Sequence, residues 1–254
     1  MSDAHEHWFE RVAEHLGSAY LRYSFTKGTE REVRFLIDVL GLEPGMRVLD
    51  VGCGPGRHAL ALAAVGIETV GIDISQTFID IASEAEVPGA SFIRADARGL
   101  TFDGEFDAAY AMCQGAFGLQ TGPAAVGDAA GLEGDRQILG RMAAAVVPGG
   151  RVGVAAFSAY FQVRNLEGGT DGSFDARSGV HHEITEIRDP AGAVRSTDLW
   201  TTCFTPRELT LLAESVGLAV SDIWSVMPGE TYERTAPHLE DAEFFMCATR
   251  GNLD

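Results

Sequence analysis

The amino-acid sequence predicts an α/β fold in which a mostly parallel sheet is covered by helices on both faces. Two observations support this prediction. Short apolar runs alternate with segments of helical periodicity between residues 47 and 157, which is typical of successive strand–helix units. The runs are apolar on both sides of the pleat, as expected for strands buried on both faces. Strands are predicted at 47–51, 68–73, 91–96, 106–112 and 151–157.

The helices follow from capping residues and apolar spacing. Thr29 and Glu32 form a capping-box pattern ahead of a helix with Val33, Leu36, Ile37 and Leu40 on one face. Thr205 and Glu208 form a second such pattern, with Pro206 at the first helical position. Further helices are predicted at 57–65, through Phe78 and Ile81, and at 135–147.

We interpret the whole chain, 1–254, as one domain with additions to its core. After Phe157 the pattern changes to alternating residues around a Pro-Ala-Gly turn at 190–192, which predicts an antiparallel hairpin. Two final strands are expected at 219–226 and 242–249, joined by a polar loop, which gives seven strands in the main sheet. The predicted parts are an N-terminal helical lid (1–28), a core (29–157), a hairpin cap (158–203) and a C-terminal helix with two strands (204–254).

Composition excludes several classes of protein. The chain has 37 acidic and 19 basic residues and a formal net charge of −18, so nucleic acids and anionic membranes are disfavoured as partners. It has no apolar run of about 18 residues and no secretory signal pattern. The four cysteines form no CxxC pair, which argues against a structural zinc and favours a reducing, cytoplasmic location.

A glycine-rich loop follows the first predicted strand in VLDVGCGPGRHA, residues 48–59. Its glycines, Gly52, Gly54 and Gly56, have GxGxG spacing, whereas a dinucleotide fingerprint has GxGxxG. Asp50 at the entrance of the loop would repel a phosphate but attract an ammonium group. The loop therefore suits a ligand with an amino-acid end, such as S-adenosylmethionine, whose sulfonium is also cationic.

Two further acids follow the next two strands. Asp73 ends the second strand and can accept hydrogen bonds from both ribose hydroxyls. Asp96 ends the third and can accept one from an adenine amino group. Because ligands of open α/β sheets bind at the carboxyl ends of the strands, these acids and the glycine loop are expected to share one crevice.

With these residues, the chain resembles the class I S-adenosylmethionine-dependent methyltransferases. The matching segments are 49–56, 71–73 (GID), 94–96 (RAD), 106–111 (FDAAYA) and 148–150 (PGG). The resemblance implies a Rossmann-like, doubly wound sheet, S-adenosylmethionine as cofactor and S-adenosylhomocysteine as product.

The resemblance also implies individual roles. Asp50 and the loop backbone, through Val51, Gly52, Cys53 and Gly54, would hold the methionine end. Asp73 would hold the ribose, and Asp96 would accept from the adenine amino group. Ile74 and Ala97 would enclose the adenine, and the backbone of Cys113 would face the amino end of the cofactor.

The acceptor is expected to be a small organic molecule, and secondary metabolism is the setting that we consider for it. The sequence MCQGAFG (112–118) lacks the Asn/Asp-Pro-Pro-aromatic signature of nucleobase amino methyltransferases. The N-terminal segment and the hairpin are expected to build the acceptor pocket. In VHHEITEI (180–187), alternation places Val180, His182 and Ile184 on one face, which we expect to point inward.

His182 and Tyr23 are therefore the candidate catalytic residues, with His182 as a base or orienting group for an O, N or C nucleophile. A base is required only if the acceptor arrives protonated. A metal site formed by His181, His182 and Glu183 is disfavoured, because neighbouring strand residues point in opposite directions, and no metal is predicted. Tyr20, Tyr23 and Phe25 are candidates for covering the cofactor or the acceptor.

Three alternatives stay open at this point. The chain could bind the cofactor or its product without transferring a methyl group. It could be a nicotinamide-dependent oxidoreductase, although the glycine spacing and Asp96 count against this. Protein or tRNA methylation is the third alternative, without a basic docking surface to support it. A monomer and a homodimer are equally compatible with the sequence.

Overall fold

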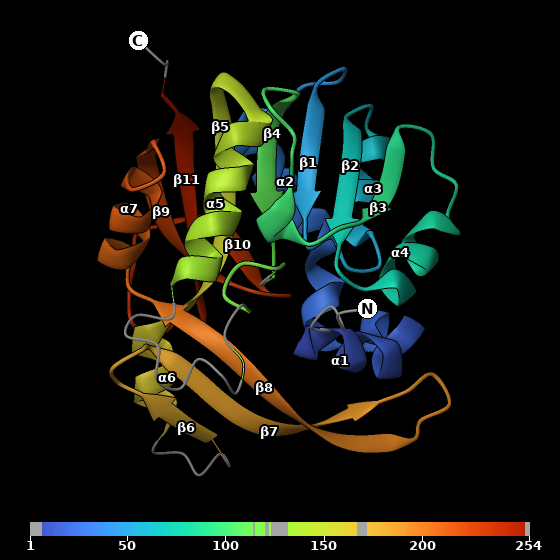
Figure 1. Ribbon diagram of the computed structural model, residues 1–254, viewed down its shortest axis with the longest axis vertical. Helices are drawn as coiled ribbons and strands as arrows, with labels where there is room; N and C mark the ends of the chain where they lie inside the picture. The colour runs from blue at the N-terminus through green and yellow to red at the C-terminus, as the bar shows by residue number, and fades with distance from the viewer. Residues whose placement is uncertain (1–6, 114, 120–121, 123–131, 167–171, 252–254) are drawn as a thin grey trace, which may run out of the picture.

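The computed structural model describes residues 7–113, 115–119, 122, 132–166 and 172–251. Its strands form a branched, mostly parallel sheet with the order β10-β9-β11-β5-β4-β1-β2-β3 (Figure 1). The parallel strands are β1 (Arg47–Val51), β2 (Glu68–Asp73), β3 (Ala90–Arg94), β4 (Phe106–Ala111) and β5 (Val146–Ser158). The antiparallel strands beside them are β11 (Glu243–Arg250), β9 (Leu218–Met227) and β10 (Thr231–Thr235). The predicted fold class is confirmed.

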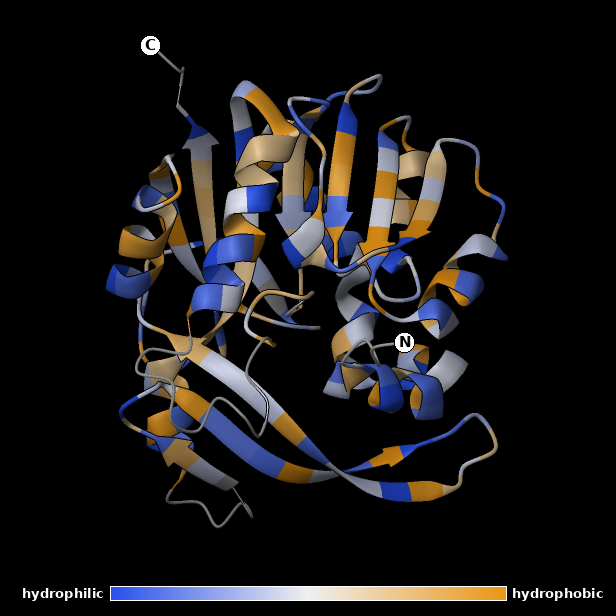
Figure 2. Ribbon diagram, viewed as in Figure 1, coloured by the Kyte–Doolittle hydropathy of each residue, from blue (hydrophilic) through white to orange (hydrophobic). Residues whose placement is uncertain are grey.

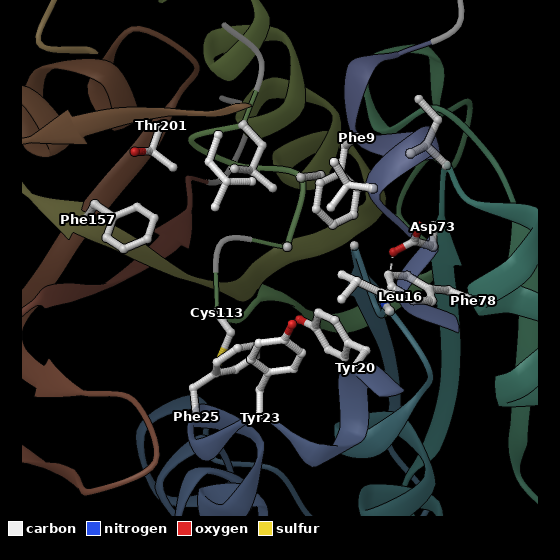
Figure 3. A pocket seen from close by; sticks show the side chains of 18 of the residues that line it. Phe9, Leu16, Tyr20, Tyr23, Phe25, Asp73, Phe78, Cys113, Phe157 and Thr201 are labelled. Carbon is white, nitrogen blue, oxygen red and sulfur yellow. Dashed lines mark hydrogen bonds between the residues drawn. The ribbon is translucent and has the colours of Figure 1, made fainter. Parts of the chain in front are cut away.

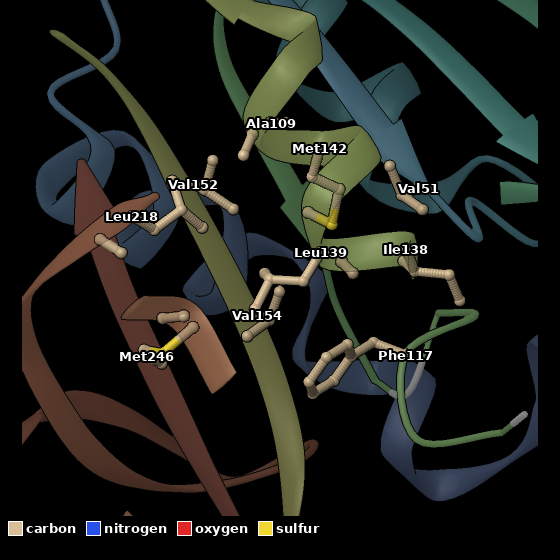
Figure 4. Close-up of a cluster of buried hydrophobic side chains, with 14 of the residues drawn as sticks. Val51, Ala109, Phe117, Ile138, Leu139, Met142, Val152, Val154, Leu218 and Met246 are labelled. Carbon is tan, nitrogen blue, oxygen red and sulfur yellow. The ribbon is translucent and has the colours of Figure 1, made fainter. Parts of the chain in front are cut away.

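Helices cover both faces of the sheet, as the buried clusters show. One cluster joins β1, β4 and β11 to α2 (Thr29–Leu40) and α3 (Arg57–Ala64). The other joins the opposite face of the sheet to α5 (Glu133–Ala145) and α7 (Pro206–Glu214) (Figure 4). The central strands are correspondingly apolar, while polar residues lie on the outer faces of the helices (Figure 2). A further helix, α4 (Gln76–Ser83), packs beside β2 and β3.

The insertion after β5 forms a second, smaller layer. It consists of α6 (Ala159–Asn165), β6 (Gly172–Asp175), β7 (Val180–Arg188) and β8 (Val194–Phe204). β7 and β8 form the predicted antiparallel hairpin, and the end of β8 returns to pair with Phe157 and Ser158 of β5. The hairpin therefore leaves and rejoins the main sheet at the carboxyl end of β5, and it extends across that end of the molecule (Figure 1).

The N-terminal segment packs on the hairpin. It forms α1 (Trp8–Leu16) and two 3₁₀ helices, η1 (Gly17–Arg22) and η2 (Ser24–Gly28). Val12 and Leu16 of α1 share a buried cluster with Ile187 of β7. The predicted lid and hairpin cap are thus in direct contact over the carboxyl ends of β1 and β2.

The structure corrects the number of strands. Residues 231–235 lie in the predicted polar loop but form β10, which extends the sheet beyond β9. Tyr232 of this strand is buried, and its ring lies 5.5 Å from that of Phe35 in α2. One apolar residue in five gives too weak an alternation to predict a strand, and the contact with Phe35 is long-range.

The structure also corrects the capping of α2. The N-cap of this helix is Gly28, which has no side chain that could form a capping hydrogen bond. Thr29 instead donates to the carbonyl oxygen of Thr26 at 3.0 Å. Glu32 is fully buried and bonds to residues of α3. The second capping box is confirmed, because Thr205 and Glu208 form both of its hydrogen bonds.

Candidate active site

A cavity of about 460 Å³ lies at the carboxyl ends of the parallel strands. Its walls come from the glycine loop, the ends of β2 and β3, the N-terminal helices, the hairpin, and the ends of β5, β9 and β11. Seven of the ten predicted cofactor residues line it: Gly52, Gly54, Asp73, Ile74, Asp96, Ala97 and Cys113. The predicted crevice is therefore present, and one cavity joins it to the predicted acceptor side.

Gly52 allows two loops to meet at the floor of the cavity. Its φ is +70°, and a Cβ at this position would lie 2.2 Å from the backbone carbonyl carbon of Gly115. Every other residue type carries a Cβ atom, which would clash with the backbone of Gly115 at that distance. The glycine loop and the loop after β4 therefore pack backbone against backbone.

Asp73 connects the second strand to the glycine loop. Its side chain is buried and accepts hydrogen bonds from the backbone N–H groups of Gly54, at 2.9 Å, and Ser75, at 2.8 Å (Figure 3). Burial raises the pKa of Asp73 to about 6, although these hydrogen bonds favour the charged form. Each carboxylate oxygen keeps a lone pair for a ligand hydroxyl, so the residue suits the predicted ribose contact.

Asp96 lies just beyond β3, because that strand ends at Arg94 instead of the predicted residue 96. It caps the short helix η3 (Ala97–Gly99), and Arg98 forms an ion pair with it at 2.6 Å. The hydrogen bonds from Arg98 are the main reason why the pKa of Asp96 is lowered. An adenine amino group would share this carboxylate with Arg98.

Asp50, Val51 and Cys53 do not line the cavity. The Asp50 side chain is buried beneath the loop, and burial raises its pKa to about 7. Val51 belongs to the apolar core. The prediction of direct contact with the methionine end is therefore not supported for the side chain of Asp50, because the strand directs that side chain beneath the loop.

A buried polar network lies next to Cys113. The Arg57 guanidinium donates to Glu32 and, at 2.8 Å, to the Sγ atom of Cys113. His58 lies 2.8 Å from the same Glu32 carboxylate. Glu32, His58 and Cys113 are close enough together to be considered as metal ligands. The guanidinium of Arg57, however, already occupies hydrogen-bonding positions on Glu32 and Cys113.

An aromatic wall completes the cavity. Phe9, Tyr20, Tyr23 and Phe25 line it from the N-terminal helices, and Phe157 lines it from the end of β5 (Figure 3). The rings of Tyr20 and Phe25 lie 5.3 Å apart. Both the sulfonium of the predicted cofactor and an apolar acceptor suit such a wall.

The two candidate catalytic residues have different positions. Tyr23 lines the cavity, and its hydroxyl accepts a hydrogen bond of 3.4 Å from the backbone N–H of Arg188. His182 is not one of the lining residues that the structure describes. It stacks on Trp200 with ring centroids 3.8 Å apart, and its Nε2 lies 2.7 Å from Asp198.

The prediction that the His182 face points inward fails at His182 and Ile184, although Val180 on that face is buried and Glu186 lines the cavity. Ile184, on that face, is 56% exposed, whereas Ile187, on the other, is 5% exposed. Ile184 suggested the wrong face in this part of the strand, because α1 packs against the face that carries Ile187. Thr185 and Ile187 line the cavity instead.

Five polar residues of the lining were missed by sequence analysis: His7, Thr185, Glu186, Thr201 and Glu243. None lies in a motif. Their presence depends on how the N-terminal segment, the hairpin and β11 pack against the core, which no local pattern encodes.

Comparison with known proteins supports the interpretation of this cavity as a methyltransferase site. Residues 48–130 match the family model described as a methyltransferase domain. This segment is similar to a methyltransferase domain, in agreement with the predicted resemblance to the class I S-adenosylmethionine-dependent methyltransferases, which use S-adenosylmethionine as their cofactor. The glycine loop and the buried Asp73 fit this cofactor.

Curated relatives match about half of the chain. It is 32% identical over 131 residues to a demethylmenaquinone methyltransferase of Renibacterium salmoninarum, with 51% of this chain and 49% of the relative covered. The corresponding protein of Beutenbergia cavernae is 35% identical over 127 residues, with 49% and 46% covered. The chain thus spans about half the length of these relatives.

Solved structures match nearly the whole fold. The CcbJ methyltransferase of Streptomyces caelestis has a TM-score of 0.72 at 15% identity, with 97% of this chain and 98% of that chain covered. CalS10 of Micromonospora echinaspora, an amino pentose methyltransferase solved with S-adenosylmethionine, has a TM-score of 0.60 at 20% identity, with 92% and 95% covered. These likenesses establish the fold, including its additions to the core. No described helix has the length and apolar character needed to span a membrane.

Proposed function

We propose that this protein transfers the methyl group of S-adenosylmethionine to a small, largely apolar organic molecule. One observation carries the proposal: a single cavity contains both the cofactor residues Gly54 and Asp73 and the aromatic wall of Tyr23, Phe25 and Phe157. A methyl donor and an apolar acceptor can therefore occupy one enclosed space.

The cofactor supplies an already activated methyl group, so the protein has to align the acceptor and exclude water. The aromatic wall would orient the acceptor, and contact between α1 and β7 would close the site. Similar proteins include a demethylmenaquinone methyltransferase and a sterol 24-C-methyltransferase, which supports a small organic acceptor without identifying the one used here.

Calorimetric titration tests the cofactor half of this proposal. We expect S-adenosylhomocysteine to bind with a dissociation constant on the order of micromolar, and NAD not to bind. Asp73→Ala should weaken binding at least about tenfold, because charge-assisted hydrogen bonds contribute roughly 1.5–3 kcal/mol each. Asp80→Ala, an exposed position on α4, is the matched control. Binding of NAD, or of neither ligand, would contradict the proposal.

Transfer requires a separate experiment. Purified protein, methyl-labelled cofactor and fractionated small-molecule extracts should yield a labelled organic product. Cofactor binding without any labelled product from any fraction would favour a binding protein that has no transfer activity.

A further inference from the structure

Glu243 is a buried carboxylate in an otherwise largely apolar part of the cavity. It is 1% exposed and lines the cavity at the start of β11. β11 pairs with β5 on one side and β9 on the other, so Glu243 lies directly beside Phe157 and Val226. Residues paired in this way share one face of the sheet, and Phe157 is a residue of the aromatic wall.

Glu243 lies on the acceptor side of the cavity. In the sheet order, β5 and β4 separate β11 from β1, which leads into the glycine loop. Three strand spacings amount to about 14 Å. Asp73 and Asp96 lie still further across, at the ends of β2 and β3. The carboxylate is therefore remote from the residues expected to hold the ribose and the adenine.

The charge of Glu243 also affects Cys113, which lines the cavity between the cofactor side and the acceptor side. Burial is the main cause that raises the pKa of the Cys113 thiol, and the charge of Glu243 adds to it. Cys113 follows β4, the strand next to β1. Glu243 thus acts electrostatically on the position where the two halves of the cavity meet.

The charges of the lining favour a cationic ligand. Four carboxylate residues line the cavity, whereas His7, whose pKa is lowered by burial, is the only basic residue among its described lining residues. A carboxylate in apolar surroundings is stabilised most strongly by a positively charged partner. An amine offers that charge, whereas an alcohol or a phenol does not.

We propose that the acceptor is an amine and that Glu243 binds its ammonium group and accepts its proton before methyl transfer. This inference rests on the proposed function. A protonated amine has no lone pair for attack, so one proton must first pass to a base. The freed lone pair then forms the nitrogen–carbon bond while the carbon–sulfur bond breaks and its electron pair remains on sulfur. The product is a methylated ammonium with S-adenosylhomocysteine, and Glu243 later releases its proton to solvent.

Matched probes test the inference. Pairs of amines and alcohols with the same carbon skeleton, such as 2-phenylethylamine and 2-phenylethanol, are titrated into the complex with S-adenosylhomocysteine and assayed with labelled cofactor. We expect the amines to bind and to be methylated in preference to the alcohols. Glu243→Gln should lower amine affinity about 10- to 100-fold and leave the affinity for S-adenosylhomocysteine unchanged.

Two further variants complete the design. Glu243→Asp keeps the charge and should recover part of the amine affinity, which a purely structural role of Glu243 would not predict. Glu240→Gln makes the same chemical change at an exposed neighbouring position and should behave like the wild type. Thermal unfolding of each variant verifies that it is folded.

Several outcomes would overturn the inference while the proposed function stands. They are methylation of alcohols in preference to amines, no transfer to any amine although S-adenosylhomocysteine binds, an unchanged amine affinity in Glu243→Gln, and a loss of S-adenosylhomocysteine affinity instead. Failure of the proposed function is distinct, because S-adenosylhomocysteine itself would then not bind to the wild type.

Discussion

At the scale of single residues, Glu32 joins four parts of the molecule. It lies in α2, accepts hydrogen bonds from Arg57 and His58 of α3, and accepts a longer one of 3.4 Å from the backbone N–H of Gly229. Through Arg57 it is also connected to Cys113 in the loop after β4. Burial alone would raise the pKa of Glu32, but the hydrogen bond from His58 and the charge of Arg57 lower it. The network therefore holds an ionised carboxylate behind the cavity wall.

Removal of the Arg57 guanidinium should destabilise the folded state, because the buried carboxylate of Glu32 then loses its cation. Arg57→Met leaves Glu32 without its cation, and we expect the free energy of unfolding to fall by about 3–5 kcal/mol in urea denaturation. The double variant Arg57→Met, Glu32→Gln removes the charge as well and should recover much of the loss. Equal losses in the single and double variants would show that the ion pair is not the cause.

At the scale of elements, the contact between α1 and β7 closes the cavity. Ile187 supplies the hairpin side of this contact, and Val12 and Leu16 supply the helix side. Beyond α1, Arg22 of η1 donates to the carbonyl oxygen of Pro190 at 3.2 Å, and the Arg188 N–H donates to Tyr23. Apolar packing therefore contributes to the attachment of α1 itself.

Shortening Ile187 should loosen α1 without unfolding the core. For Ile187→Ala we expect local protection of residues 8–16 in hydrogen exchange to fall by about 2 kcal/mol, together with weaker binding of S-adenosylhomocysteine. Ile184→Ala is the control, because Ile184 lies on the same strand but is 56% exposed. The same change in both variants would argue against the packing of α1 on this face.

Asp135 provides a pH-dependent link between α5 and the loop after β4. Its carboxylate is fully buried and accepts a hydrogen bond of 2.7 Å from the backbone N–H of Gly118. Burial raises the pKa of Asp135 to about 7. In the unfolded state the pKa of this carboxyl group is near 3.9. Between about pH 4 and pH 7, Asp135 is therefore largely protonated in the folded state and largely ionised in the unfolded state.

The stability contribution of Asp135 should thus decrease as pH rises. In that window its slope reaches about 1.4 kcal/mol per pH unit. Asp135→Asn removes this titration, so the wild type should lose stability relative to the variant between pH 5 and pH 7 in urea denaturation. Asp80→Asn, at an exposed position, should leave the pH profile of the wild type unchanged. A parallel pair of profiles for the wild type and Asp135→Asn would refute the assignment.

At the scale of the whole molecule, the charge distribution decides which large partners are accessible. The chain carries 37 acidic and 19 basic residues. Affinity for nucleic acids comes largely from Lys and Arg side chains that replace counterions on the phosphate backbone. A strongly acidic protein instead raises the local concentration of cations, which agrees with a cationic cofactor and an amine acceptor.

We expect no binding of labelled tRNA or duplex DNA at 0.15 M salt. Fluorescence anisotropy should give no transition up to about 100 µM protein, which corresponds to the weak end of non-specific binding. Addition of S-adenosylhomocysteine should not alter this result. A salt-sensitive transition at low micromolar protein would reopen the alternative of tRNA methylation.

The cofactor half of the site could be predicted from the sequence because it depends on local patterns. Gly52, Gly54 and Asp73 lie within one strand–loop–helix unit and the strand that follows it. Their positions follow once the strands are recognised, since the carboxyl ends of parallel strands meet at one edge. The core strands, α3 and the capping box at Thr205 were predictable for the same reason.

The acceptor half was decided only by the tertiary structure. Alternation in β7 defines two faces but not which one is covered, and the packing of α1 on Ile187 selected the face opposite to His182. Glu243 entered the cavity because β11 lies between β5 and β9, a pairing between residues far apart in the sequence. The sequence by itself thus determined the fold class and the cofactor, whereas long-range packing determined which side chains line the rest of the cavity.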